Sequence, residues 1–172
     1  MSGDSALSLI PFDRSQAPLL AEWLARPHVA PWHPDPGAWL RWALNPPQES
    51  AHALIDWDGR PIGYLRWQKV SRETLDSLGL NEIPEGSVDI DILIGEADCL
   101  GRGLGPRALS ILVETLREDR SIPLLGLTTS ILNAAAQRAF EKAGFRKTRE
   151  YEPPGFGPCA LMVMRLDRRA RT

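Results

Sequence analysis

The sequence predicts one α/β domain of the α+β kind, built on a mixed sheet. Its 172 residues suffice for one domain with a hydrophobic core, and 43% hydrophobic against 24% charged residues is ordinary for a folded chain. Strands joined by a tight turn come first, and strands alternating with helices follow. This order predicts helices packed on a mixed sheet, with residues 1–172 forming a single domain.

The first half of the chain is expected to supply three strands and two helices. In chain order these are a strand at 6–12, a helix at 15–25, a proline-rich loop at 28–36, a helix at 37–44, and strands at 51–57 and 61–68. Pro27 limits the first helix because proline cannot continue the hydrogen-bond ladder. The dipeptide Asp58-Gly59 between two apolar runs is a strong signal for a hairpin turn.

The second half is expected to alternate strands and helices. In chain order these are a loop with a helical turn at 69–86, a strand at 87–95, a glycine-rich loop at 101–105, a helix at 106–118, a strand at 122–128, a helix at 133–143, and strands at 145–151 and 159–167. Leu109, Leu112 and Leu116 recur at helical spacing and predict the buried face of the helix at 106–118.

Composition excludes several classes of partner. Twenty Lys and Arg against 22 Asp and Glu give a net charge of −2, which argues against nucleic acid. No apolar run approaches the roughly 20 residues of a membrane span, and the first residues do not resemble a signal peptide. Cys99 and Cys159 form no metal-binding or redox pair, which favours a cytoplasmic protein. The three histidines lack metal-ligand spacing, so no metal is expected, and we expect a monomer or homodimer.

A glycine-rich loop lies between a predicted strand and a predicted helix, with the sequence Leu-Gly-Arg-Gly-Leu-Gly-Pro over residues 100–106. Glycines allow sharp turns and bring backbone N–H groups and a helix N-terminus close to a phosphate. A tight turn without a ligand is the simpler alternative. The loop lacks the Gly-Lys-Ser/Thr of a Walker motif, and Leu124-Leu125 occupy the position of the acidic residue in a dinucleotide fingerprint.

Together with a second segment, residues 133–145, this loop resembles the GNAT superfamily of N-acetyltransferases, which use acetyl-CoA. The family patterns are Arg/Gln-x-x-Gly-x-Gly/Ala in the loop and Asn-x-x-Ala-x-x-x-Tyr-x-Lys-x-Gly-Phe in the later helix. The residues that match are Gly103, Gly105, Asn133, Ala136, Lys142, Gly144 and Phe145. Leu100 replaces the usual Arg or Gln, and Phe140 replaces the tyrosine.

The resemblance implies a splayed sheet of six to seven strands with about four helices, and acetyl-CoA as co-substrate. It implies that the backbone of 92–94 meets the acetyl-pantetheine and that N–H groups of 101–105 hold the pyrophosphate. The cofactor-binding residues it implies are Ile92, Leu93, Ile94, Gly101, Arg102, Gly103, Leu104, Gly105, Asn133, Phe140 and Lys142.

Within the superfamily the chain is similar to the branch of aminoglycoside 6′-N-acetyltransferases and siderophore-type lysine N-acyltransferases. The likeness rests on residues 22–32, on Pro-Ile-Gly-Tyr at 61–64 and on the spacing from Asp91 to the glycine-rich loop. It implies a small polar amine as acceptor, with an aminoglycoside as the first choice. Thr128 and Phe156 stand where that branch has acidic residues, so a polycation should bind less tightly.

Two aspartates are the candidate residues of the acceptor site. In the strand at 87–95, alternation places Asp89 and Asp91 on one face. The resemblance assigns Asp91 to face the acceptor amine, and we predict Asp91 as the catalytic proton acceptor, with Asp89, Asp91 and Trp32 binding substrate. A salt bridge between an aspartate and Arg66 is the structural alternative, and packing is the alternative for Trp32.

The predicted mechanism is direct transfer in a ternary complex, with a backbone N–H of 92–94 stabilising the oxyanion. Because Phe140 has no hydroxyl, water or another group must protonate the CoA thiolate. An acyl-enzyme on Cys99 is a weaker alternative because no base partner is visible. Two other functions stay open: a protein or peptide N-acetyltransferase, and a non-catalytic acyl-CoA-binding module.

Overall fold

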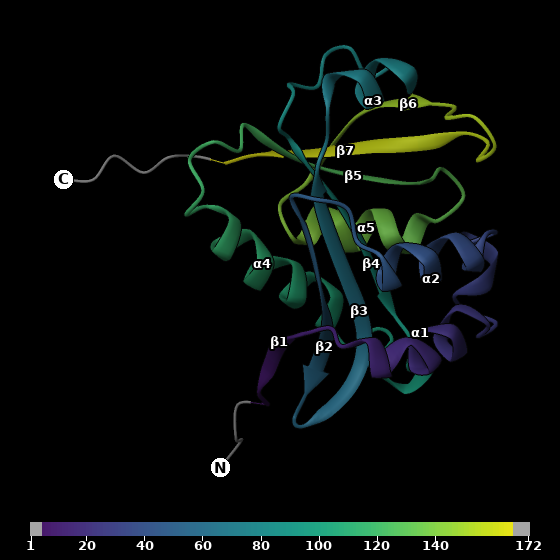
Figure 1. Ribbon diagram of the computed structural model, residues 1–172. Coiled ribbons are helices and arrows are strands. Elements are labelled where there is room, and N and C mark those ends of the chain that lie inside the picture. Colours follow the sequence, from purple (N-terminus) through teal and green to yellow (C-terminus); the bar gives the residue numbers. More distant parts are fainter. Residues whose placement is uncertain (1–4, 167–172) are drawn as a thin grey trace.

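The computed structural model describes residues 5–166, and within them the chain forms a mixed seven-stranded sheet with five α-helices (Figure 1). The strands are β1 (Leu7–Pro11), β2 (Ser50–Trp57), β3 (Arg60–Lys69), β4 (Val88–Ile94), β5 (Leu124–Ser130), β6 (Arg146–Tyr151) and β7 (Cys159–Arg165). The helices are α1 (Ala17–Leu24), α2 (Pro36–Leu44), α3 (Arg72–Ser77), α4 (Leu104–Leu116) and α5 (Ala134–Lys142). The sheet order is β1-β2-β3-β4-β5-β7-β6, which confirms the predicted fold class.

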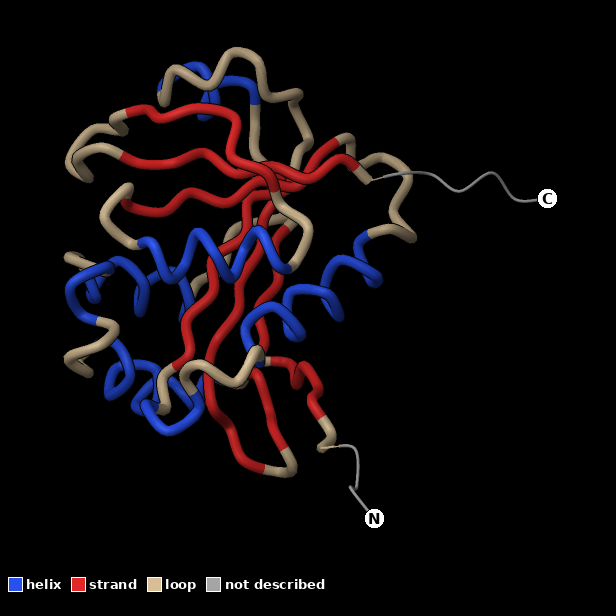
Figure 2. The backbone as a smooth tube through the Cα atoms, turned by 180° about the vertical axis from the view of Figure 1, so that it is seen from behind, coloured by secondary structure: helices blue, strands red, loops and turns tan. Residues whose placement is uncertain are grey.

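The sheet opens between its two central strands. Parallel strands β4 and β5 pair at only two positions, Val88 with Leu125 and Asp89 with Gly126, whereas β3 and β4 pair at seven. Beyond Asp89 the two strands diverge, so the sheet consists of two halves that meet at one end and separate at the other (Figure 2). Backbone groups along the diverging part of β4 lose their neighbour on that side and are left for a ligand.

Three apolar clusters hold the layers together. The largest joins α4 and α5 to one face of the sheet through residues such as Ile90, Leu109 and Leu125. A second cluster joins α1 and α2 to the opposite face around Trp23 and Tyr64. A third packs the segment around α3 on that same face, against β5 and β7. The face of the sheet that carries α1, α2 and α3 is therefore covered at both ends and open between them.

Local sequence explains where the central elements begin. Helix α4 starts at Leu104, two residues earlier than predicted, because Gly103 takes a left-handed conformation (φ 72°) at the N-cap position. Pro106 then lies in the first turn, where its missing N–H costs no hydrogen bond. The helical turn expected within 69–86 is α3, capped by the Ser71 side chain. The last strand ends at Arg165, and its predicted end, Asp167, lies outside the described residues.

Candidate active site

The centre of the site is an ion pair between neighbouring strands. Asp91 of β4 stands opposite Arg66 of β3, and Arg66 Nε donates to Asp91 Oδ2 at 2.9 Å. The guanidinium also lies 3.9 Å from the ring centroid of Trp39 and 5.0 Å from that of Trp42, both on α2. The salt bridge considered as the structural alternative is thus present. It engages one carboxylate oxygen only; the other oxygen of Asp91 accepts no hydrogen bond from residues 5–166.

Asp89 lies two positions earlier on the same face of β4, and its surroundings differ. It faces Gln68 of β3 instead of an arginine. Burial and, to a lesser extent, the neighbouring charge of Asp91 raise the pKa of Asp89 to about 8, although Arg66 and a hydrogen bond with Gln68 oppose the shift. A carboxyl group with a strongly raised pKa in a cavity is typical of acid–base sites.

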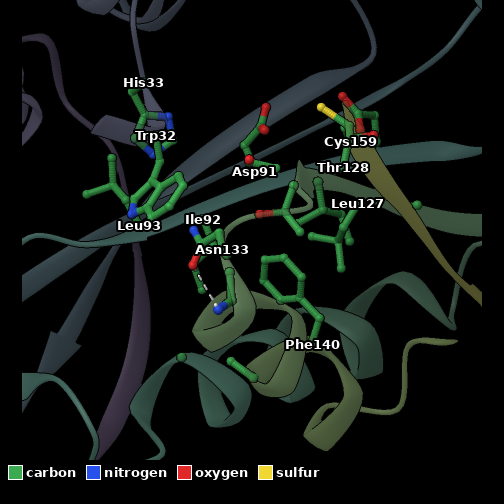
Figure 3. Close-up of a pocket in the computed structure, with 18 of the residues that line it drawn as sticks. Trp32, His33, Asp91, Ile92, Leu93, Leu127, Thr128, Asn133, Phe140 and Cys159 are labelled. Atoms are coloured by element: carbon green, nitrogen blue, oxygen red, sulfur yellow. Dashed lines mark hydrogen bonds between the residues drawn. The ribbon is translucent and has the colours of Figure 1, made fainter. Parts of the chain in front are cut away.

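Trp32 and His33 line the cavity beside Asp91 (Figure 3). They end the short 3₁₀ turn Ala30–Trp32, in the loop that sequence patterns had predicted as irregular. The indole of Trp32 is 39% exposed, so it is available to a ligand, whereas the His33 ring packs edge-on against Trp39 at 4.5 Å. Burial lowers the pKa of His33, the charge of Asp91 opposes this shift, and Arg66 adds to it.

The backbone of β4 turns alternate N–H groups toward the open side of the sheet. Gly95 N–H donates to Ile62 O of β3, so by antiparallel alternation Leu93 also faces β3, while Ile92 and Ile94 face the splay. His28 Nε2 donates to Ile94 O at 2.9 Å and ties the preceding loop to this strand end. Three residues were predicted to meet the acetyl-pantetheine through their backbone. The backbone of Leu93 faces β3 instead, and its side chain packs in the cluster with α1.

The glycine-rich loop forms a lining of backbone amides at the N-terminus of α4. Gly101 and Gly103 both adopt positive φ values, 73° and 72°, which side chains rarely tolerate. At Gly105 a Cβ would meet no atom within 4 Å, so the space in front of the helix is open. The first N–H groups of a helix have no partner within it, and here they face the cavity. These residues fit a pyrophosphate.

The side chain of Arg102, in the same loop, points away from the cavity. Its Nε donates to Asp98 O at 3.0 Å, and its guanidinium lies 5.4 Å from the ring centroid of Trp57. Arg102 therefore braces the loop from behind, and any contact with a cofactor must come from its backbone.

Helix α5 lines the other wall of the splay. Asn133 is its N-cap, with Oδ1 accepting from Ala136 N at 3.1 Å, and its side-chain amide N–H groups face the cavity (Figure 3). Phe140 is 8% exposed and packs in the largest cluster, so its ring fills the position where the family has a tyrosine. Lys142 lines the cavity at the last turn of the helix.

One continuous cavity of about 1150 Å³ connects all these groups. It runs from the glycine-rich loop, through the splay, to the aspartates on the opposite face, where Thr128 and Phe156 also line it. Cys99 and Cys159 line it as well, but burial raises the pKa of both thiols, which argues against an acyl-enzyme. Among residues 5–166 there is no cluster suited to a metal ion, and no helix that could span a membrane.

The opening in the sheet has an amide-lined loop on one side and carboxylates on the other. This arrangement suits an acyltransferase, which brings a phosphate-bearing thioester to an amine. The chain matches the acetyltransferase (GNAT) domain family over residues 13–152 and belongs to it. It is an acetyl-CoA-dependent N-acetyltransferase.

The proteins similar to this chain include aminoglycoside-modifying enzymes. The chain is 33% identical over 156 residues to the aminoglycoside N(6′)-acetyltransferase type 1 of Klebsiella pneumoniae, covering 84% of this chain and 76% of that protein. A kanamycin resistance protein of Rhizobium radiobacter is 35% identical over 82 residues, 48% of this chain and 75% of that protein. A crystal structure of the aminoglycoside acetyltransferase AAC(6′)-Ib with coenzyme A and kanamycin superposes with a TM-score of 0.78 at 28% identity, covering 93% of this chain and 95% of that one.

Several residues of the site were not predicted from the sequence. Trp39 and Trp42 pack against the Arg66 guanidinium, but the sequence pattern indicated only that they form the apolar face of a short helix. Gly126 and Ser87 line the cavity without belonging to any motif. A salt bridge between Arg66 and an aspartate was considered from the sequence, but the choice of Asp91 as its partner depends on register, which local patterns do not specify.

Proposed function

We propose that this enzyme transfers the acetyl group of acetyl-CoA to a primary amine of a small polar acceptor, with an aminoglycoside 6′-amine as the leading candidate. The observation that carries the proposal is the continuous cavity that links the amides of 101–105 to Asp91 through the splay. The names of its relatives support the acceptor class. Helices α2 and α3 pack over the face of the sheet where the acceptor would bind, which favours a small-molecule acceptor over a protein chain.

The residues of the splay would bind the cofactor. We propose that amides of 101–105 hold the pyrophosphate, that Asn133 and Lys142 contact the pantetheine arm and its phosphates, and that Phe140 packs beside the thioester. Bound acetyl-CoA supplies the activated acetyl group. The N–H groups of Ile92 and Ile94 then hold the negative charge that develops on the acetyl oxygen.

The two aspartates would bind and deprotonate the acceptor. The free oxygen of Asp91 faces the cavity and receives the ammonium group, and the proton passes to Asp91 as nucleophilic attack begins. The new N–C bond forms as the thioester C–S bond breaks, and water protonates the departing thiolate because Phe140 cannot. Asp89 lies next to Asp91 on the same face, and the charge of Asp91 helps to raise the pKa of Asp89. Trp32 stacks on the acceptor from the mouth of the cavity.

A thiol-release assay with acetyl-CoA tests this function. We expect CoA release with kanamycin and ribostamycin, and the product should gain the mass of one acetyl group. A polyamine and a lysine-containing peptide serve as comparison acceptors. Release with the peptide alone would favour a protein acceptor, and saturable acetyl-CoA binding without release for any amine would favour a binding module. Fractionation and light scattering test the proposed cytoplasmic location and the monomer or homodimer.

A further inference from the structure

The cavity does not end at the aspartates. Ser87, which directly precedes β4, and Asp89 and Asp91 within β4 stand at alternate positions, and all three line it. The segment around α3 and β7 add a mainly apolar lining: Val70, Leu75, Leu78, Leu80, Ile83 and Leu161, with Thr74 of α3. We call this part of the cavity the α3 chamber.

The floor of the α3 chamber is open because a side chain is missing there. Gly126 of β5 stands directly opposite Asp89 in the parallel pair. A Cβ at Gly126 would meet a single atom within 4 Å, Met162 O at 4.0 Å, and the backbone does not hold a positive φ. Another residue would therefore fit the backbone but would fill the space next to Asp89.

A buried hydroxyl marks the far end of the chamber. Ser87 is 2% exposed, and its Oγ has no hydrogen-bond partner among residues 5–166. Burying a hydroxyl without a partner is unfavourable, and most buried polar groups in proteins are paired. Ser87 lines the cavity, but its Oγ is closed off from solvent, so a polar atom of a ligand supplies the missing partner only when the side chains that cover the hydroxyl move apart.

The charges and the exposed apolar side chains of the cavity also suit an acceptor with a single ammonium group. Among the described lining residues the acidic side chains are Asp35, Asp89 and Asp91, and the permanent cations are Arg66, Arg138 and Lys142. Large apolar side chains of the lining are exposed: Trp32 39%, Phe156 64% and Leu132 78%. A ligand with one ammonium group and an apolar arm can therefore pair its charge with Asp91 and bury its arm.

We propose that the α3 chamber is a second acceptor subsite, which binds the apolar arm of a primary amine whose nitrogen lies at Asp91 and whose far end hydrogen-bonds Ser87. The proposal rests on the acetyl transfer proposed above and extends it to a further substrate class, ω-hydroxyalkylamines. The reaction is the same, since the amine nitrogen gains the acetyl group, CoA leaves as a thiol, and the amine proton passes to the aspartates.

Two homologous series of amines test the subsite by CoA release. For n-alkylamines from ethylamine to hexylamine, kcat/KM should rise about fourfold for each methylene until the chamber is filled. In the matching ω-amino alcohols, one length should exceed its alkylamine about tenfold, because its hydroxyl reaches Ser87. Ser87→Ala should remove the advantage of that alcohol. Ser77→Ala is the matched control, because Ser77 lies on α3, is exposed and bonds Thr74 O.

Gly126→Val should flatten the rise with chain length by filling the floor. If this variant does not fold, Leu78→Phe narrows the chamber from the α3 side. A wild-type series without length dependence, or one that both blocking variants leave unchanged, would overturn the proposal. If neither kanamycin nor any amine supports CoA release, the proposed function fails. Calorimetric titration with hexylamine, compared between wild type and Gly126→Val, then decides the subsite: tighter binding to the wild type supports it, and equal binding overturns it.

Discussion

Replacing Asp91 by asparagine separates a catalytic role of this side chain from a structural one. Asparagine has nearly the same size and can still accept a hydrogen bond from Arg66 Nε, but it loses the charge and the ability to take up a proton. If Asp91 accepts the proton of the amine, kcat should fall by about 10²- to 10⁴-fold, the usual contribution of a general base. Acetyl-CoA affinity should stay within a factor of about two, because the glycine-rich loop lies on the other side of the splay.

The structural cost of the same substitution should be small. Removing one partner of a fully buried ion pair costs about 3–5 kcal/mol. Here the Arg66 side chain is 15% exposed and that of Asp91 is 31% exposed, and asparagine keeps one acceptor. Solvent screening and the remaining hydrogen bond reduce the expected loss to about 1 kcal/mol. For a chain of this length that is a fall of about 2–4 °C in Tm.

The matched control is Arg66→Gln, which breaks the same pair but keeps the carboxylate. Steady-state CoA release and thermal denaturation are measured for wild type, Asp91→Asn and Arg66→Gln with the best acceptor. Loss of turnover in Asp91→Asn alone, with similar Tm changes in both variants, indicates proton transfer. An effect on KM that shrinks with added salt indicates attraction of the cation only. Equal losses of Tm in both variants with wild-type turnover would refute a catalytic role for Asp91.

Three further predictions concern other parts of the site. Gly105→Val places a branched side chain in front of α4 at a position whose φ is not positive, so the backbone is not strained. Acetyl-CoA should then no longer raise Tm. An unchanged Tm shift would mean that the pyrophosphate does not bind at this loop. Phe140→Tyr returns a hydroxyl beside the thioester, so kcat should rise severalfold if thiolate protonation limits the rate; equal kcat means that it does not. Asp89 has a raised pKa of about 8, so its folded form binds a proton that the unfolded chain releases near pH 4. Stability should therefore fall as pH rises from about 4 to 8, and Asp89→Asn should flatten that slope in denaturant titrations at several pH values; an identical slope in the variant would contradict the raised pKa.

Much of the fold followed from local patterns. The Asp58-Gly59 turn and the alternation in 87–95 each depend on residues adjacent in sequence, and the structure has the corresponding elements. The number of strands and the splay came from the family resemblance. Helix boundaries were less accurate: Pro106 looked like the first residue of α4, but the left-handed Gly103 starts that helix two residues earlier.

The sequence predicted which backbone positions form the candidate site, but it predicted fewer of the side-chain contacts between them. Glycines at 101–105 and the asparagine at 133 are specified by motifs whose chemistry is local. The aromatic support of Arg66 is not local, because Trp39 and Trp42 come from a helix about 25 residues earlier and reach Arg66 only after α2 packs on the sheet. Ser87 is similar, since an unpaired hydroxyl becomes visible only when every possible partner has been placed.

The two aspartates show most clearly what register adds to a sequence pattern. Alternation assigned both to one face of β4, but it could not say which of them would face Arg66. The pairing of Arg66 with Asp91 and of Gln68 with Asp89 is set by how residues 70–87 fold back between β3 and β4. A slip of two residues in one direction would keep the same faces but place Arg66 opposite Asp89 and Tyr64 opposite Asp91. The arginine would then form its ion pair with Asp89, and Asp91 would lose its partner. The fold of the α3 segment therefore decides which aspartate pairs with the arginine, as well as forming the chamber beside them.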